Sequence, residues 1–251
     1  MRTTNFMSNF LAEFIGTALL LLLGNGVVAN VILEKTKGSG SGWLVITIAW
    51  GLSVFVGVFV SGPYSGAHLN PAVSVGLAVA GVFDWQNVPE YVAGQLLGAA
   101  FGTTLAWLTY RQHMRITADP DTKLSTFSTM PAIRSTADNF FSEMIGAFVL
   151  VFAVLFIASP TFSSSEIGTV EFGLGALGAL PVGLLVFVIG LSLGGTTGYA
   201  INPARDLAPR IMHTLLPIEG KRDSDWGYAW IPVVGPLTGG GLAGFLYSVM
   251  L

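Results

Sequence analysis

Cysteine, histidine and charged residues are scarce in this sequence. The absence of cysteine excludes disulfides and thiolate metal sites. The three histidines (His68, His113 and His213) are scattered and suggest no ligand cluster, so we expect no metal and no cofactor. Charged residues make up 10% of the 251 residues, against roughly 25% in soluble proteins. The small net charge of -3, with no long basic cluster, disfavours a nucleic-acid partner.

Motifs for catalysis are missing as well. The sequence has no serine elbow, no Gly-rich phosphate loop followed by Lys-Ser or Lys-Thr, and no metal-binding spacing. These absences argue against an enzyme and against an ATP-driven pump.

Long apolar runs dominate the sequence instead. Hydrophobic residues make up 52% of the chain and the mean hydropathy is +0.69, which indicates an integral membrane protein. A helix of about 20 residues crosses a hydrocarbon core about 30 Å thick. Six runs reach that length and predict an all-α membrane protein: 8–33, 43–62, 88–110, 139–159, 173–195 and 228–250. The first run exceeds the core of a signal peptide, about 7–15 residues, so we interpret it as a retained span.

Two shorter segments begin with the tripeptide Asn-Pro-Ala. These are Asn70-Pro71-Ala72 and Asn202-Pro203-Ala204, and a glycine lies four residues before each asparagine. Asparagine is a preferred helix N-cap and proline is favoured in the first turn, so each tripeptide predicts a helix start. The helices at 70–80 and 202–213 are too short to span and are predicted to be half-helices. Polar connections remain at 111–138, 159–172 and 214–227.

The two halves of the chain, approximately 1–115 and 135–251, repeat one pattern. Phe10, Glu13, Ile15, Gly16 and Leu20 recur as Phe140, Glu143, Ile145, Gly146 and Leu150. Gly66 and the first tripeptide recur as Gly198 and the second. Each half carries three spans, an odd number, so the second half crosses the membrane in the opposite sense. We therefore predict a single transmembrane channel domain, an inverted repeat whose half-helices enter from opposite faces.

The predicted half-helix starts favour passage of neutral molecules. A helix N-terminus carries unpaired N–H groups and about half a positive elementary charge, so two such ends near the midplane disfavour cations and protons. Non-helical backbone at that depth is tolerated where it lines a cavity, so the loops at 63–69 and 195–201 are expected to expose carbonyls. The expected carbonyls are those of Gly66, Ala67, His68, Gly198, Tyr199 and Ala200. Asn70 and Asn202 are expected to point their amide NH2 groups at the permeating molecule.

These residues resemble the aquaporin family of major intrinsic proteins, and within it the aquaglyceroporins or glycerol uptake facilitators. The resemblance covers essentially the whole chain and rests on SGAHLNPA at 65–72 and GYAINPARD at 198–206. It implies a homotetramer in the lipid bilayer, with one pore per subunit for glycerol, water and other small neutral solutes. It also implies cytoplasmic termini and, with the short tails, favours a bacterial inner membrane.

The resemblance places a selectivity filter at Trp50, Gly190, Tyr199 and Arg205. The first half has Val73 where the second has Arg205. Arginine stays protonated, and its fork of donors suits two neighbouring hydroxyl oxygens. The aromatic pair would pack a solute's carbons, and Gly190 would leave room for the solute where water-selective relatives typically have histidine. Glycerol facilitators often have phenylalanine at the site of Tyr199, whose hydroxyl would narrow the filter or bind a more polar solute.

Three acidic residues are expected to be structural. Glu13 and Glu143 lie in apolar segments, where a carboxylate is a candidate proton relay, but their duplication at an offset of 130 favours a scaffold role. In similar proteins such glutamates hold the re-entrant loops through backbone N–H groups. Asp206 matches the glycerol-channel form of the second motif and is expected to form hydrogen bonds near the half-helix start.

Two other functions remain as alternatives. Gly190 and Asp206 argue against a water-selective channel. The intact set of Asn70, Asn202 and Arg205 argues against a non-conducting structural membrane protein on the same fold.

The distribution of basic residues favours the opposite orientation. With cytoplasmic termini, only Arg2 lies in the inside tails and loops, whereas lysines and arginines usually gather on the cytoplasmic side. The outside connections would carry Lys35, Lys37, Arg111, Arg115, Lys123, Arg134, Lys221 and Arg222. We keep the cytoplasmic termini because the repeat pattern is specific and the charge rule is statistical.

Overall fold

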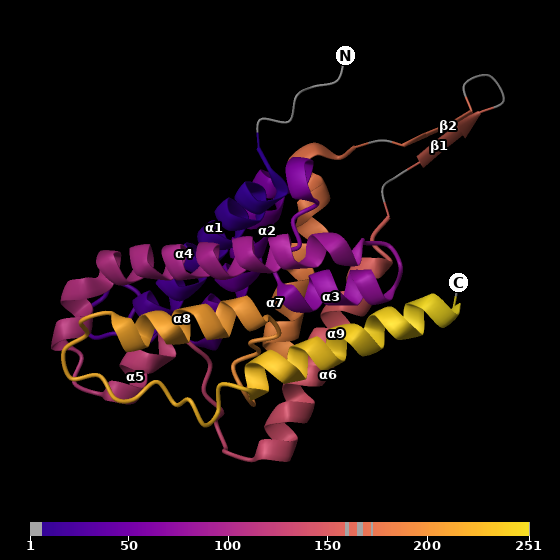
Figure 1. Cartoon of the computed structure of the whole chain (residues 1–251). Coiled ribbons are helices and arrows are strands. Elements are labelled where there is room, and N and C mark those ends of the chain that lie inside the picture. The colour runs from indigo at the N-terminus through magenta and orange to yellow at the C-terminus, as the bar shows by residue number, and fades with distance from the viewer. Residues whose placement is uncertain (1–6, 159–160, 165–167, 172, 251) are drawn as a thin grey trace.

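Six long helices and two half-helices make up most of the chain (Figure 1). The computed structural model describes residues 7–158, 161–164, 168–171 and 173–250, so Arg2 lies outside the described residues. The long helices are α1 (Asn9–Ile32), α2 (Trp43–Ser65), α4 (Val88–Ile116), α6 (Thr136–Leu155), α7 (Leu180–Leu193) and α9 (Ile231–Met250). Short 3-10 turns, η1 (Trp85–Asn87) and η2 (Gly175–Ala179), precede α4 and α7. With these turns included, all six helices are long and apolar enough to cross a membrane.

The half-helices are α3 (Pro71–Val79) and α8 (Pro203–Leu215), close to their predicted bounds. Each begins directly after an asparagine that caps it. The Asn70 Oδ1 accepts a hydrogen bond from the Ala72 N–H at 2.8 Å, and the Asn202 Oδ1 accepts one from the Ala204 N–H at 3.0 Å. Both helix starts therefore follow from the local chemistry of the Asn-Pro pair.

The two halves pack in the same way. In the first half α1 packs against α2 and α4, and in the second α6 packs against α7 and α9. Each half-helix contacts the last helix of the other half: α3 packs on α9, and α8 packs on α4. The halves also meet where α2 packs against α7. Because each half-helix packs on a helix of the other half, the two half-helix starts lie side by side inside the bundle.

Glycines bring the paired helices into close contact. A Cβ on Gly102 of α4 would lie 2.1 Å from the Ala18 carbonyl oxygen of α1. At the equivalent interface a Cβ on Gly239 of α9 would lie 2.0 Å from the Met144 carbonyl oxygen of α6. Only residues without a side chain allow backbones to approach this closely.

The first re-entrant loop is shorter than predicted. We predicted non-helical backbone from residue 63, but α2 continues through Pro63 to Ser65. Gly66 ends the helix in the left-handed conformation (φ +78°), and its N–H bonds to the Gly62 carbonyl at 3.0 Å. Only glycine takes this conformation without strain, so the helix stops there and not at the proline.

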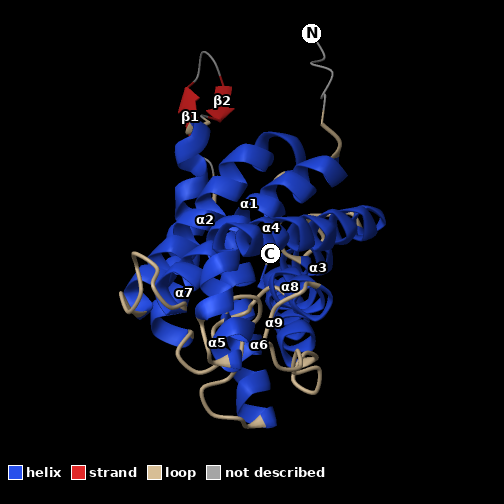
Figure 2. Ribbon diagram, turned by 90° about the vertical axis from the view of Figure 1, so that its left-hand side faces the viewer, coloured by secondary structure: helices blue, strands red, loops and turns tan. Residues whose placement is uncertain are grey.

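Two connections contain structure that we did not predict. The serine-rich segment 159–172 includes an antiparallel pair, β1 (Thr161–Ser164) and β2 (Gly168–Glu171), while 159–160, 165–167 and 172 lie outside the described residues. The short helix α5 (Pro120–Ser125) follows Asp119, which caps it. Figure 2 shows the β1–β2 hairpin at one end of the bundle and α5 at the other.

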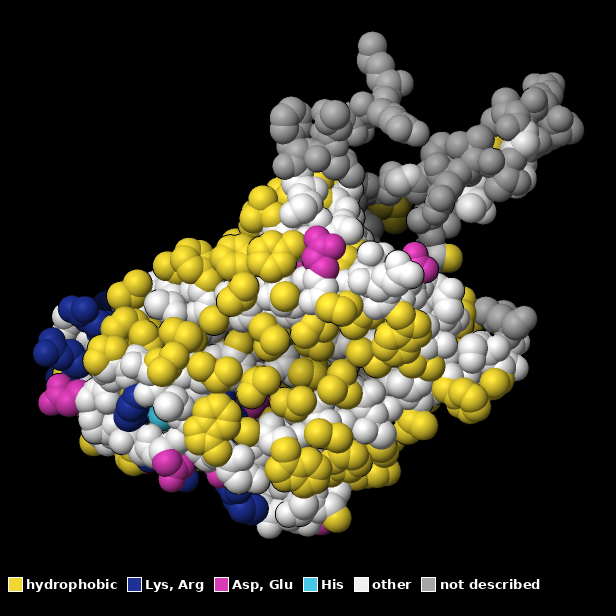
Figure 3. Space-filling view, in the orientation of Figure 1, with side chains coloured by type: hydrophobic (Ala, Val, Ile, Leu, Met, Phe, Trp, Pro, Cys, Tyr) yellow, Lys and Arg dark blue, Asp and Glu magenta, His cyan; other side chains and the backbone are white. Residues whose placement is uncertain are grey.

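The surface is divided into an apolar middle and a charged rim. Hydrophobic side chains cover the centre of the face in Figure 3, and lysines and arginines gather at one end. Ion pairs join the connections around α5 there: Arg115 to Glu219, Arg222 to Asp121 and Arg134 to Asp225. This distribution suits a multi-pass membrane protein.

Candidate pore and selectivity site

Each half-helix is preceded by a loop that contains two left-handed residues other than glycine. In the first loop Ala67 and Leu69 have φ of +53° and +54°. In the second, Tyr199 and Ile201 have φ of +38° and +42°. Such conformations cost about 1–3 kcal/mol each for residues other than glycine, so the surrounding structure must hold them in place.

Glu13 holds the first loop from inside α1. Its side chain is fully buried, and its Oε1 accepts hydrogen bonds from the His68 N–H at 2.9 Å and the Ser65 hydroxyl at 2.7 Å. Its Oε2 accepts from the Leu69 N–H and the Gln95 side chain, both at 2.7 Å. This carboxylate satisfies the N–H groups that the left-handed backbone turns inward.

Glu143 holds the second loop in the same way. Its Oε1 accepts from the Ala200 N–H at 2.9 Å and the Thr197 hydroxyl at 2.6 Å, and its Oε2 accepts from the Ile201 N–H at 2.8 Å. Our sequence reasoning missed the hydroxyl partners. The signal was present, because Ser65 and Thr197 each precede the repeated glycine by one residue.

We expect Glu143→Gln to lower both stability and solute permeability. In either orientation the amide turns its NH2 group toward a backbone N–H, that of Ala200 or that of Ile201, and a buried unsatisfied donor costs about 1–3 kcal/mol. Thermal unfolding in detergent and solute flux in vesicles measure the two effects. The matched control is Glu219→Gln, because the Glu219 side chain is 76% exposed in a surface ion pair. Equal unfolding temperatures of the two variants would contradict this role.

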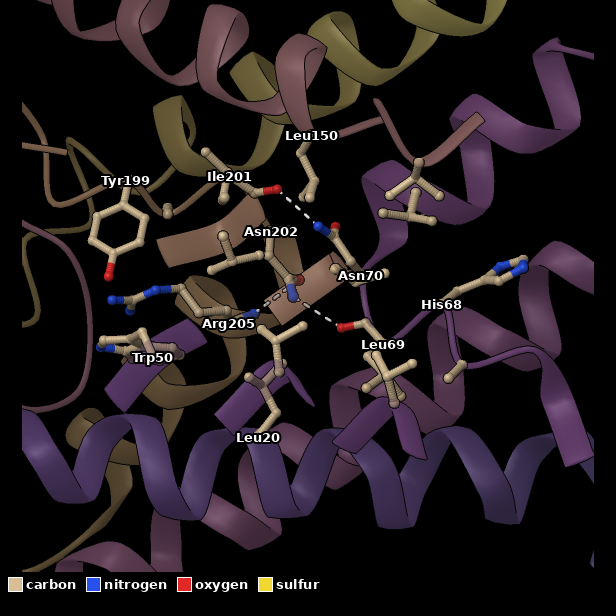
Figure 4. A pocket seen from close by; sticks show the side chains of 18 of the residues that line it. Leu20, Trp50, His68, Leu69, Asn70, Leu150, Tyr199, Ile201, Asn202 and Arg205 are labelled. Carbon is tan, nitrogen blue, oxygen red and sulfur yellow. Dashed lines mark hydrogen bonds between the residues drawn. The ribbon is translucent and has the colours of Figure 1, made fainter. Parts of the chain in front are cut away.

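The two asparagines of the half-helices link the loops to each other. The Asn70 Nδ2 donates to the Ile201 carbonyl at 2.8 Å, and the Asn202 Nδ2 donates to the Leu69 carbonyl at 2.9 Å (Figure 4). We expected these amide NH2 groups to point at the permeating molecule, but each donates to a carbonyl of the opposite loop. An amide nitrogen carries two hydrogens, so one of each pair fixes the opposite loop and one is left for a solute.

Two cavities meet beside these loops. The inner cavity, about 170 Å³, extends from Gly66 and His68 past both asparagines to Arg205. The outer cavity, about 470 Å³, extends from Arg205 to the acidic residues around α5. Trp50, Tyr199 and Arg205 line both cavities. These three residues therefore form the junction between the two cavities.

Arg205 presents its guanidinium at this junction. Its Cζ lies 4.3 Å from the centre of the Trp50 ring, a cation–π contact. Among the described residues, none accepts a hydrogen bond from the side chain of Arg205, although the residue is only 8% exposed. Its N–H groups therefore lie at the junction of the two cavities without an acceptor among the described residues.

Gly190 lies behind the Tyr199 ring and is not one of the residues that line the two cavities. A Cβ on Gly190 would lie 2.7 Å from the Tyr199 Cζ and 2.9 Å from the Thr47 Cγ2. The Tyr199 ring fills the space that we expected Gly190 to leave for the solute. The Gly190 carbonyl accepts a hydrogen bond from the Trp43 indole at 3.1 Å. Trp43 and Thr47 carry no motif signal, so the sequence did not reveal them.

The predicted carbonyls lie along the two loops. None of the carbonyl oxygens of Gly66, Ala67, His68, Gly198, Tyr199 and Ala200 accepts a hydrogen bond from another described residue. All six residues line one or both cavities. The His68 ring points away from the asparagines in Figure 4 and pairs with the Ser74 hydroxyl at 3.0 Å. Of His68, the backbone is the part suited to contact a solute.

Asp206 connects α8 to the outer connections. Its Oδ2 accepts from the Thr129 N–H at 2.7 Å and hydroxyl at 2.6 Å, and its Oδ1 accepts from the Arg210 Nε at 2.8 Å. The fully buried Arg210 also donates to the Ser224 carbonyl at 2.8 Å. Our sequence reasoning missed Arg210, although its i, i+4 spacing from Asp206 is the usual spacing of a helical ion pair.

Two carboxylates lie at the outer mouth, and one of them, Asp121, pairs with Arg222. Asp119 and Asp121 line the outer cavity. Hydrogen bonds from the Thr122 hydroxyl and N–H hold the pKa of Asp119 below its ordinary value, so this carboxyl is ionised at neutral pH. In the part of the chain that the structure describes, no three His, Cys, Asp or Glu residues gather in a group that could hold a metal.

Six spans in an inverted repeat, with two half-helices meeting at a lined passage, define a membrane channel. The chain belongs to the major intrinsic protein family, whose family model matches residues 1–247. This finding confirms the family and the fold class predicted from the sequence.

Known relatives cover almost the whole chain. The chain is 52% identical over 242 residues to a probable glycerol uptake facilitator protein of Thermotoga maritima, covering 96% of this chain and 99% of that one. It is 51% identical to the glycerol uptake facilitator protein of Streptococcus pneumoniae, covering 97% and 99%. The X-ray structure of the aquaglyceroporin from Plasmodium falciparum matches with a TM-score of 0.80 at 34% identity, covering 96% and 94%.

Proposed function

We propose that this chain is a passive channel for glycerol, water and other small neutral solutes. The observation that carries the proposal is the junction of the two cavities, where Arg205 holds free donors against the face of Trp50. The names of the relatives, glycerol uptake facilitators and an aquaglyceroporin, support glycerol as a solute.

The geometry suits a molecule with one polar and one apolar edge. At the junction the guanidinium can donate to two neighbouring hydroxyl oxygens while the indole of Trp50 packs against the carbons. The inner cavity has an apolar wall that includes Leu20, Val54 and Leu150. The loop residues and the two asparagines supply the polar part of its lining. A solute can therefore exchange its hydration for protein contacts on both edges, whereas the half-helix N-termini disfavour cations.

Osmotic experiments on proteoliposomes test this proposal. Vesicles containing the protein should shrink rapidly in sucrose, and in glycerol they should shrink and re-swell much faster than protein-free vesicles. Stopped-flow light scattering measures both rates. Fast water flow without glycerol uptake would replace the proposal with a water-selective channel. Vesicles indistinguishable from the protein-free control in both assays would identify a non-conducting structural protein.

We also propose a homotetramer in the lipid bilayer, with one pore per subunit and both termini in the cytoplasm of a bacterium. The large apolar side chains on the outside of the bundle support burial against lipid or other subunits; Leu52 and Phe101 are each 50% exposed. In this orientation α5 and the outer mouth face outward.

A further inference from the structure

A third, small cavity lies between α1, α4 and the segment that follows α5. Its volume is about 10 Å³, and each residue that lines it is at most 8% exposed. Of the described residues that line it, none lines the inner or the outer cavity, so it is separate from the pore. A space of this size holds about one water-sized probe. The cavity can therefore accommodate a single water molecule.

Two polar side chains from neighbouring helices meet at this cavity. The Asn25 Nδ2 of α1 donates to the Thr103 Oγ1 of α4 at 2.9 Å. Among the described residues, none donates to the Asn25 Oδ1, and none accepts the hydrogen of the Thr103 hydroxyl. The next hydroxyl on α4, that of Thr104, instead donates to the Ala100 carbonyl at 2.8 Å. Buried polar groups normally have partners, so the acceptor on Asn25 and the donor on Thr103 indicate a polar occupant.

The third polar side chain comes from the segment after α5. The Thr126 hydroxyl donates to the Lys123 carbonyl at 2.7 Å. A hydroxyl oxygen also has two acceptor sites, so it can still accept a hydrogen bond. This oxygen lies 3.9 Å from the sulfur of Met114, and both residues line the small cavity. The cavity thus presents one donor and two acceptors from three separate elements.

We infer that the small cavity binds one water molecule, which bridges Asn25, Thr103 and Thr126. The water accepts a hydrogen bond from the Thr103 hydroxyl. It donates one hydrogen to the Asn25 Oδ1 and the other to the Thr126 hydroxyl oxygen. Three hydrogen bonds are the typical number for a buried water molecule, and both hydrogens of the water are used.

This water supports the wall of the outer cavity from behind. The segment 125–130 lies between the outer and the small cavity. Four of its residues line the outer cavity: Ser125, Ser128, Thr129 and Met130. The other two, Thr126 and Phe127, line the small cavity. The bridge through Thr126 therefore attaches this wall to α1 and α4.

A structure of the unmodified protein in lipid, at a resolution that shows ordered water, tests the inference. We expect a density peak within hydrogen-bond distance of the oxygens of Asn25, Thr103 and Thr126, about 2.5–3.0 Å where both partners are oxygen. A small cavity without a peak would overturn the inference. A peak that contacts only Asn25 and Thr103 would overturn the bridge to the wall.

The double variant Asn25→Leu, Thr103→Val tests whether the polar groups hold the water. A cavity lined by apolar groups stays dry, so the peak should disappear. The matched control is Thr104→Val, which removes a hydroxyl bonded within α4 and should keep the peak. A peak that persists in the double variant, or that disappears in the control as well, would overturn the assignment to these groups. If the double variant does not fold, the density in the unmodified protein decides the case.

Discussion

Histidine in place of Gly190 should reduce glycerol permeability about tenfold or more and reduce water permeability much less. The Cβ alone would lie within 3.0 Å of Tyr199 and Thr47, so the imidazole has no space of its own. Overpacking of this kind costs about 1–3 kcal/mol, and the side chain that can move is Tyr199, toward the cavities. The cross-section then excludes a three-carbon solute before it excludes water.

Gly195→His is the control for this substitution. Nothing lies within 4 Å of a Cβ on Gly195, which lies two residues past the end of α7. Stopped-flow rates for glycerol and water in both variants give the comparison. If Gly190→His kept the glycerol rate of the control, the Tyr199 ring would not be the element that limits the passage.

The sequence predicted the scaffold of the pore because its signals are local. An Asn-Pro pair identifies a helix start within a few residues, and the structure places α3 and α8 within two residues of the predicted bounds. The duplicated glutamates followed from the repeat. The order of residue types along the chain was sufficient to predict the half-helix starts and the paired glutamates.

The sequence did not predict the contacts between segments that are distant in the chain. The cross-loop bonds of Asn70 and Asn202 join positions separated by 131 and 133 residues. The contact of Tyr199 with Gly190 depends on how the second loop packs against α7, which composition and spacing do not determine. For the same reason the sequence did not identify Trp43, whose indole N–H donates to the carbonyl of Gly190, 147 residues away in the chain.

Alanine at Gly239 should destabilise the protein far more than alanine at Gly241, although both lie on α9. Alanine is favoured over glycine in a helix by about 0.5–1 kcal/mol, so helix propensity alone predicts stabilisation at both sites. A Cβ on Gly239, however, would lie 2.0 Å from the Met144 carbonyl oxygen of α6, whereas nothing lies within 4 Å of one on Gly241.

The neighbour of Gly239 is backbone, so it cannot move aside as a flexible side chain would. The helices α6 and α9 must separate, which costs packing along the whole interface of the second half. We expect Gly239→Ala to lose about 3 kcal/mol or more of stability, at the upper end of overpacking effects, and Gly241→Ala to gain slightly. Thermal unfolding of the detergent-solubilised variants measures the difference. Equal unfolding temperatures would show that the close approach of α6 and α9 is not what holds the second half together, and that the repeat is maintained by the pore loops instead.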